Sequence, residues 1–412
     1  MEALELDQTA VKCPVTITVV GVGGAGCNAV DRMISVDIPE VSYVVLNTDA
    51  QALERSDAQR KICLGGPRTR GLGAGGNPTV GAAAAKLSLD EITRALEGSD
   101  LVFIAAGMGG GTGSGAAPVV ADAARSVGAL TVGVVTSPFS FEGFRRRKVA
   151  EEALAELEKH VDTLIVVPND KLLAFTSEKI TLDIAFRIAD DVLRQGIQGI
   201  SEVITRPGLI NVDFADVRKI MSQGGTSLMS IAQAKGPERA LEAAQSAIAS
   251  PLIATESISG AKGILINVVG GPDMTLHEAG QAVEYITEQA SEDAEVIFGA
   301  AIDNSMGDKL QITLIATGVG SAAQTQRRPV AATVAPAPAR QPLVAERPQP
   351  QRGGIAVPRE FEERLARVRD NGNGNGNGHG EPRRTERVPE PALAHAGGLE
   401  IPTFLRRARG LL

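Results

Sequence analysis

Short apolar runs alternate with helical patterns in the first half of the chain. We predict buried strands at residues 15–20, 41–46, 101–105, 130–136 and 163–167. Helices are expected from residue 28, from about residue 116 and over residues 147–160. Strands that alternate with helices indicate βαβ units and a parallel sheet. The carboxyl edge of such a sheet is where a ligand binds.

The second half has a different pattern. A long helix is predicted over residues 183–204, and the Pro207-Gly208 pair ends it. Helices at 240–249 and 276–289 and strands at 264–269, 295–301 and 310–316 then indicate a smaller α/β unit. The predicted fold class is therefore α/β, with an N-terminal doubly wound parallel-sheet domain, a long central helix, a smaller C-terminal α/β domain and a disordered tail.

The tail is predicted from composition. Residues 330–350 are rich in Ala, Pro and Gln, and residues 371–378 are four Asn-Gly repeats. Such stretches bury too little apolar surface to offset their ordering entropy. The last residues regain Leu, Ile and Phe, which is typical of a docking peptide at the end of a linker. We expect six segments along the chain: 1–14 (disordered), 15–182, 183–207, 208–320, 321–398 (linker) and 399–412 (peptide).

Composition and charge exclude several classes of protein. Hydrophobic residues make up 43% of the 412, and no apolar run is long enough for a membrane-spanning helix. The first 14 residues lack the pattern of a signal peptide, so we expect a cytoplasmic protein. Residues 321–412 carry 15 Arg and 9 acidic residues, a net +6, which leaves −14 on the rest. An acidic body is not expected to bind nucleic acid. Three cysteines without a CxxC pair predict neither a disulfide framework nor a zinc site.

Three glycine-rich loops are the strongest chemical signal. Residues 107–115 read Gly-Met-Gly-Gly-Gly-Thr-Gly-Ser-Gly, between a strand and a helix, and residues 21–28 and 71–78 are also rich in glycine. Glycines let backbone N–H groups approach phosphates closely. The first loop has GxGxxG spacing, and Asp49 follows the second strand, so a NAD-dependent oxidoreductase stays open at this point. Three loops suit several phosphates better, and the lysine of a P-loop is missing.

Four longer motifs carry a family resemblance. Residues 109–115 match the signature of the tubulin superfamily, and residues 138–143, 167–172 and 205–216 are similar to its bacterial cell-division branch. The resemblance spans about residues 15–318 and the extreme C-terminus. It implies a GTPase that polymerises head-to-tail into filaments and forms the contractile ring at the cell-division site. Its ligands would be GTP and GDP, with Mg²⁺ held mainly by the phosphates.

The resemblance also implies roles for individual residues. Asn169 and Asp190 would read the guanine edge, and Phe186 would stack on the base. Glu142 and Arg146 would hold the ribose and phosphate side, although which of residues 145–147 faces the nucleotide is left open. The remaining nucleotide-binding residues would hold the phosphates: Gly24, Ala25, Gly26, Cys27, Asn28, Gly111, Thr112 and Gly113.

Hydrolysis is expected to need a second subunit. In this family, the loop that holds Asn211, Asp213 and Asp216 enters the neighbour's nucleotide site and positions the attacking water. From the residues alone, Asp213 could instead cap a helix that begins near Phe214. A scaffold that binds GTP without hydrolysing it therefore stays open as an alternative.

The resemblance also implies partners and a location in the cell, and two positions differ from the family pattern. The peptide 399–412 resembles the family's segment for division adaptor and regulator proteins, so membrane contact would be indirect. The protein would lie in the cytoplasm, at the mid-cell division ring. Thr79 and Ala82 stand where the family usually has an acidic residue and an arginine, which affects contacts around the third glycine loop.

Overall fold

The computed structural model describes residues 15–319, except 37, 39, 174–179, 206–207, 211, 251 and 254–257. All of these described residues fall within the unit Met1–Ala331. The second unit, Ala332–Leu412, lies outside them, as do the predicted segments 1–14, 321–398 and 399–412.

The N-terminal part is built on six parallel strands in the order β3-β2-β1-β4-β5-β6. The order reverses beside β1, which is the doubly wound arrangement that the sequence predicts. Runs of Val, Ile, Leu and Ala fill these strands because helices cover both faces of the sheet. The strands are β1 (Ile17–Val22), β2 (Val41–Asn47), β3 (Arg60–Cys63), β4 (Leu101–Gly107), β5 (Leu130–Ser137) and β6 (Thr163–Pro168).

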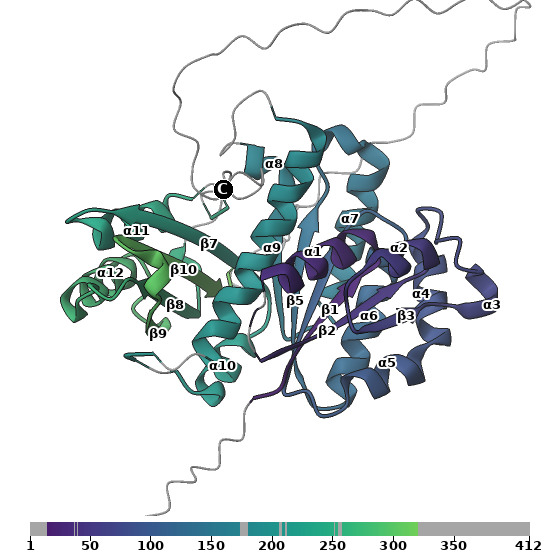
Figure 1. Ribbon diagram of the computed structural model, residues 1–412, viewed down its shortest axis with the longest axis horizontal. Coiled ribbons are helices and arrows are strands. Elements are labelled where there is room, and N and C mark those ends of the chain that lie inside the picture. Colours follow the sequence, from purple (N-terminus) through teal and green to yellow (C-terminus); the bar gives the residue numbers. More distant parts are fainter. Residues whose placement is uncertain are drawn as a thin grey trace, which may run out of the picture. The chain divides into compact units, whose positions relative to one another are not determined.

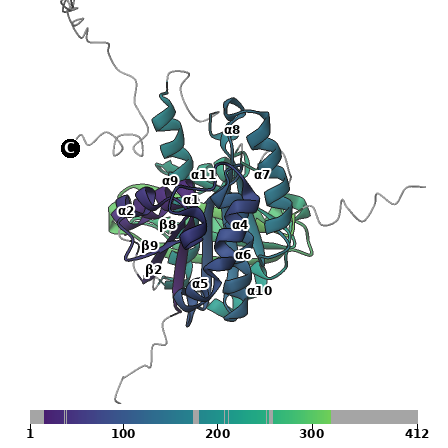
Figure 2. The same cartoon turned by 90° about the vertical axis from the view of Figure 1, so that its right-hand side faces the viewer.

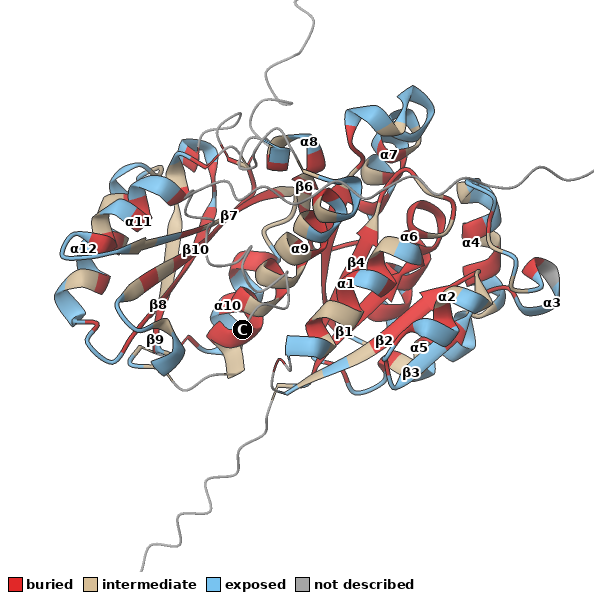
Figure 3. Cartoon of the chain, turned by 45° about the horizontal axis from the view of Figure 1, so that its top comes forward, coloured by how far each residue is buried: buried red, intermediate tan, exposed pale blue. Residues whose placement is uncertain are grey.

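Helices α1, α2 and α9 cover one face of this sheet, and α4 to α7 cover the other. Figure 3 shows the buried strands beneath helices whose outer faces are exposed. The helices of this part are α1 (Gly23–Val36), α2 (Ala50–Arg55), α3 (Gly66–Thr69), α4 (Pro78–Leu87), α5 (Leu89–Leu96), α6 (Thr112–Ser126), η1 (Ser140–Glu142), α7 (Phe144–Leu157) and α8 (Asn169–Leu172).

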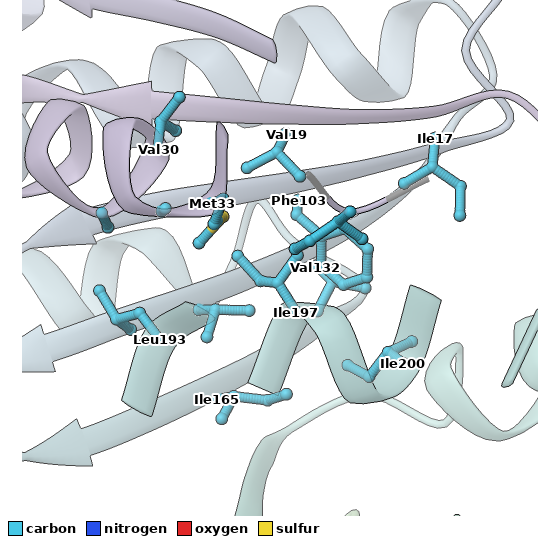
Figure 4. Close-up of a cluster of buried hydrophobic side chains, with 14 of the residues drawn as sticks. Ile17, Val19, Val30, Met33, Phe103, Val132, Ile165, Leu193, Ile197 and Ile200 are labelled. Carbon is cyan, nitrogen blue, oxygen red and sulfur yellow. The ribbon is translucent and has the colours of Figure 1, made fainter. Parts of the chain in front are cut away.

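The long helix α9 (Leu182–Thr205) confirms the predicted central helix. Its 24 residues span about 36 Å. Leu193, Ile197 and Ile200 recur at helical spacing and are fully buried against the sheet. Figure 4 shows these side chains packed towards Phe103 and Val132 of the sheet. In Figure 1, α9 runs between the N-terminal and C-terminal sets of strands.

The C-terminal part continues the same sheet. Strand β7 pairs with β6 through Leu164↔Thr226 and Ile165↔Ser227, so that ten strands form one sheet. Antiparallel pairs of β10 with β7 and β8, and a parallel pair of β8 with β9, complete it. The elements are α10 (Phe214–Met221), β7 (Thr226–Lys235), α11 (Arg239–Ile248), η3 (Ile258–Gly260), β8 (Gly263–Gly270), α12 (Leu276–Glu288), β9 (Glu295–Ile302), η4 (Asn304–Met306) and β10 (Lys309–Thr317).

Several element boundaries differ from the sequence prediction. Helix α1 begins at Gly23 and not at residue 28, and α6 begins at Thr112 and not near residue 116. The first turn of α1 packs so closely against β4 that only glycine fits at position 26. A Cβ on Gly26 would lie 2.2 Å from the Ala105 carbonyl oxygen. The prediction also missed β3 and β7, whose polar or alternating sequences lack a continuous apolar run.

The described part of the chain has no helix that is both long and apolar enough to cross a membrane.

Candidate functional site

The three glycine loops meet at the carboxyl edge of the parallel strands. Gly23 adopts φ +73°, and a Cβ there would lie 2.9 Å from the Gly113 nitrogen, so the first and second loops touch. A Cβ on Gly111 would lie 2.8 Å from the Asn77 nitrogen, so the third loop packs directly against the second. The Thr112 hydroxyl is 2.7 Å from that of Thr48, which follows β2. The structure thus brings together loops that are separated in the sequence.

Part of this edge is open. A Cβ on Gly24, Gly75, Gly76, Gly110 or Gly143 would meet no atom within 4 Å. A hollow of about 490 Å³ lies between the third loop, the second loop and the start of α7, and it is lined by Gly75, Gly76, Gly109, Gly110, Gly111, Glu142, Gly143, Phe144, Arg145, Arg146 and Val149. A hollow of this size between glycine backbones suits an anionic ligand.

Two helices start at these loops. The first turns of α1 and α6 contain Gly24 to Cys27 and Thr112 to Gly113, so their free backbone N–H groups lie at the carboxyl edge. Helix N-termini favour anions through these donors and through the helix dipole. The Ser114 hydroxyl accepts from the Gly109 nitrogen at 2.9 Å and is buried. Ser114 therefore ties the second loop to α6.

The three consecutive arginines have different surroundings. Arg145 and Arg146 line the hollow. Arg146 also forms an ion pair with Glu142, whose other oxygen accepts from the Phe139 nitrogen at 2.9 Å. Arg147 donates to the Ser140 hydroxyl at 2.9 Å instead. The structure thus places Arg145 and Arg146, and not Arg147, beside the hollow.

A buried amide lies at the end of β6. Asn169 is 4% exposed, and its Oδ1 has no hydrogen-bond partner among the described residues. A buried acceptor without a partner costs about 1–3 kcal/mol, so a ligand that donates a hydrogen bond to this oxygen would remove that cost.

Aromatic rings lie close by. Phe186, which is 39% exposed, meets Phe139 edge-on, with ring centroids 5.5 Å apart. Phe141 stacks on Phe139 at 4.9 Å. Phe141 and Phe186 both keep exposed surface, on which a base could stack.

Asp190 lies one turn after Phe186 on α9 and is buried against α1. Burial raises the pKa of its carboxyl to about 6, and the repulsion of Asp191 adds to this. The charge and hydrogen bond of Arg32 lower the pKa of Asp190, with Nε 3.1 Å from Oδ2. Asp190 is therefore shielded from solvent and not a charge on an exposed helix face.

Two of the predicted catalytic residues, Asp213 and Asp216, lie at the other edge of the sheet. Asp213 caps α10 by accepting from the Asp216 nitrogen at 2.8 Å, and both side chains are exposed. Arg218 of the same helix donates to the carbonyl of Asp100, which immediately precedes β4. Figures 1 and 2 both place α10 at the opposite end from α7 and α8. Asn211 lies outside the described residues.

Four further residues that the sequence analysis named are either held in structural contacts, buried or exposed to solvent. Asp49 caps α2 through Oδ1, which accepts from the Gln51 and Ala52 nitrogens, so this residue has a structural role at the start of that helix. Cys27 is buried, which raises the pKa of its thiol to about 12 and keeps it protonated. Asn28 is exposed on the first helix. Thr79 is exposed in the first turn of α4, whose cap is Asn77.

Sequence reasoning missed three residues at this site. Thr48, Phe139 and Arg32 contact Thr112, Phe186 and Asp190 respectively. Only Arg32 had a local signal, because it follows Asn28 by four positions and so lies on the same side of a helix.

The described residues contain no group of three His, Cys, Asp or Glu side chains that could hold a metal ion.

Fold and site together define an α/β protein whose glycine loops and helix N-termini form an anion-binding arrangement at the carboxyl edge of a doubly wound sheet. Residues 16–177 match the GTPase domain of the Tubulin/FtsZ family, and residues 225–320 match the C-terminal domain of the FtsZ family. The chain belongs to the Tubulin/FtsZ family.

Relatives agree with this assignment. The chain is 48% identical over 330 residues to the cell division protein FtsZ of Magnetospirillum gryphiswaldense, and the match covers 80% of this chain but 59% of that protein. An empty FtsZ dimer from M. jannaschii has a TM-score of 0.71 and 47% identity, and the match covers 74% of this chain and 88% of the other. A GDP-bound CetZ1 monomer from Haloferax volcanii has a TM-score of 0.65 at 22% identity, over 74% and 95% of the chains, and it shows the fold alone.

Proposed function

We propose that this chain binds and hydrolyses GTP and polymerises head-to-tail into filaments that form the contractile ring at the cell-division site. Membership of the Tubulin/FtsZ family supports the GTPase activity. The 48% identity to a cell division protein supports the role in division.

The buried, unpartnered Oδ1 of Asn169 is the observation that supports the position of the base. It lies at the end of β6, whereas the glycine loops lie at the ends of β1 and β4. A nucleotide with its phosphates on the loops would therefore direct its base towards β6 and α9. Asp190 supplies a carboxylate that accepts from both N1–H and N2–H₂ of guanine, and adenine lacks this pair of donors. The site thus fits GTP better than ATP or NAD.

The placement of Asp213 and Asp216 supports an active site made by two subunits. They lie at the amino edge of the sheet, and the phosphate loops lie at its carboxyl edge. The seven residues of β4 alone span about 20 Å. One chain therefore cannot bring both halves together, whereas a head-to-tail neighbour can. A heterologous contact of this kind repeats without closing and produces a filament.

Each group has a defined task in this reaction. The loop N–H groups and the α6 N-terminus hold the phosphates, and Arg146 stabilises their negative charge. The neighbour's Asp213 and Asp216 orient the attacking water and accept hydrogen bonds from it, and the family motif assigns Asn211 to the same task. The groups at this edge are mostly backbone N–H donors, which bind phosphate oxygens and not cations, so a Mg²⁺ ion would be held mainly by those phosphate oxygens. It would supply neutralisation of the charge that develops on them.

The chain outside the described residues is assigned from its sequence. We propose that 321–398 is a flexible tether and that 399–412 docks on division adaptor and regulator proteins. Membrane contact would then be indirect, and the protein would lie in the cytoplasm at mid-cell. The boundaries at residues 182, 207 and 320 are part of the same proposal.

Phosphate release from GTP, measured across protein concentration, tests the proposal. A site completed by a neighbour gives a rate per molecule that rises above a threshold concentration. A scaffold that binds GTP without hydrolysing it releases no phosphate, and a NAD-dependent oxidoreductase binds NAD in a direct titration. A rate per molecule that is independent of concentration would contradict the two-subunit site.

A further inference from the structure

Among the described residues, Arg32 is the cation that acts on the buried carboxylate of Asp190 at the base end of the site. Asp190 keeps 10% of its side-chain surface exposed, and the Arg32 side chain keeps 35%. Nε of Arg32 lies 3.1 Å from Oδ2 of Asp190, so the pair joins α1 to α9. Among the described residues, the charged groups that act on Asp190 are Arg32 from α1 and Asp191 from α9. Asp191 opposes ionisation, and Arg32 favours it.

The geometry leaves Oδ1 of Asp190, and one lone pair of Oδ2, for a ligand. Oδ2 accepts from Arg32, and Oδ1 accepts no hydrogen bond within the described part of the chain. Phe186 lies four positions earlier on α9, so its ring and the Asp190 carboxyl lie on the same side of the helix. A base that stacks at Phe186 would therefore meet the carboxyl edge-on.

The protonation state of this carboxyl decides which base it fits. An ionised carboxylate only accepts hydrogen bonds, which matches the paired donors N1–H and N2–H₂ of guanine. A protonated carboxyl donates one hydrogen bond and accepts another. That pattern matches adenine, which offers an acceptor at N1 and a donor at its 6-amino group. The same side chain thus favours guanine when it is ionised and fits adenine when it is protonated.

We propose that Arg32 is a positioning residue for nucleotide selectivity: it holds Asp190 in the ionised state that reads guanine. This inference rests on the proposed GTP-binding function. Burial without a partner strongly disfavours a charged carboxylate. Without Arg32, Asp190 would be protonated over a wider range of pH, and the preference for GTP over ATP would fall.

The test compares GTP and ATP affinities of the full-length chain between pH 5 and pH 9. Using the ratio of the two affinities cancels the titration of the triphosphates themselves. The variants are Arg32→Gln, which removes the charge, and Arg32→Lys, which keeps it. Arg187→Gln is the matched control, because Arg187 also lies near the base end but pairs with Asp183 at 2.8 Å.

In the wild type, the ratio should fall as pH decreases through about 6. In Arg32→Gln, the fall should occur at higher pH. A shift of about two pH units, within the range produced by a neighbouring arginine, lowers GTP affinity about tenfold at pH 7. Arg32→Lys should restore most of the preference at pH 7, and Arg187→Gln should follow the wild type.

Two results would overturn the inference and leave the function intact. One is a GTP preference in Arg32→Gln that follows the wild-type profile, with folding verified by circular dichroism. If Arg32→Gln does not fold, a wild-type ratio that stays constant from pH 5 to pH 9 overturns it instead. A wild type that shows no preference for GTP at pH 8 contradicts the proposed function itself.

Discussion

Replacing Asp213 by serine should slow GTP hydrolysis while leaving the fold as stable as the wild type. Asp213 caps α10 through its hydrogen bond to the Asp216 nitrogen, and serine is about as good an N-cap as aspartate. Serine has no carboxylate to orient and polarise a water molecule. Such a group typically contributes about 10²–10⁴-fold to rate. We therefore expect hydrolysis at least about a hundredfold slower.

Asp213→Ala provides the contrast. Alanine removes both the cap and the carboxylate, which costs about 1 kcal/mol of unfolding free energy and lowers the Tm by about 2–4 °C. Its hydrolysis rate should match that of Asp213→Ser. The measurements are phosphate release above the threshold concentration and thermal unfolding of the same samples. Normal hydrolysis by Asp213→Ser would refute the catalytic role and leave Asp213 as a cap only.

Three further outcomes are expected. Burial raises the folded-state pKa of Asp190 above its unfolded value, so ionisation of Asp190 destabilises the nucleotide-free fold. Asp190→Asn should therefore be more stable than the wild type above pH 6. In urea unfolding, the difference in unfolding free energy between the two proteins should shrink as pH falls from 6 to 4. Gly111→Ala should lose about 1–3 kcal/mol, because its Cβ would lie 2.8 Å from the Asn77 nitrogen, whereas Gly110→Ala has open space and should match the wild type in the same denaturation. Removing residues 399–412 should leave phosphate release unchanged and abolish binding to an adaptor in a pull-down; lost hydrolysis would contradict a separate peptide.

Local sequence patterns were sufficient to predict the α/β fold class. Buried parallel strands read as continuous apolar runs, and the glycine loops mark the ends of β1 and β4. The long helix was predicted to within one residue at each end, because its apolar positions keep helical spacing over its whole length. The fold follows from these features because each of them is set by neighbours along the chain.

Long-range contacts could not be predicted in this way. Arg32 and Asp190 are 158 positions apart, and no local pattern relates them. The two-residue pairing of β6 with β7 joins the predicted domains into one sheet, although the sequence suggested separate units. Gly26 lies in α1, where a Cβ would be 2.2 Å from the Ala105 carbonyl oxygen, and this contact with β4 has no signal in the local sequence. The roles of the individual site residues stay predictions.

The most direct test of the two-subunit site is a mixing experiment. Asp213→Ser keeps an intact phosphate site, and Thr112→Asp keeps an intact Asp213 while its new carboxylate repels phosphate. Each variant alone should be nearly inactive. In an equal mixture, about a quarter of head-to-tail contacts pair the two intact halves, so phosphate release should reach up to about a quarter of the wild-type rate. A mixture that never exceeds the sum of its two components would contradict an active site shared between neighbouring subunits.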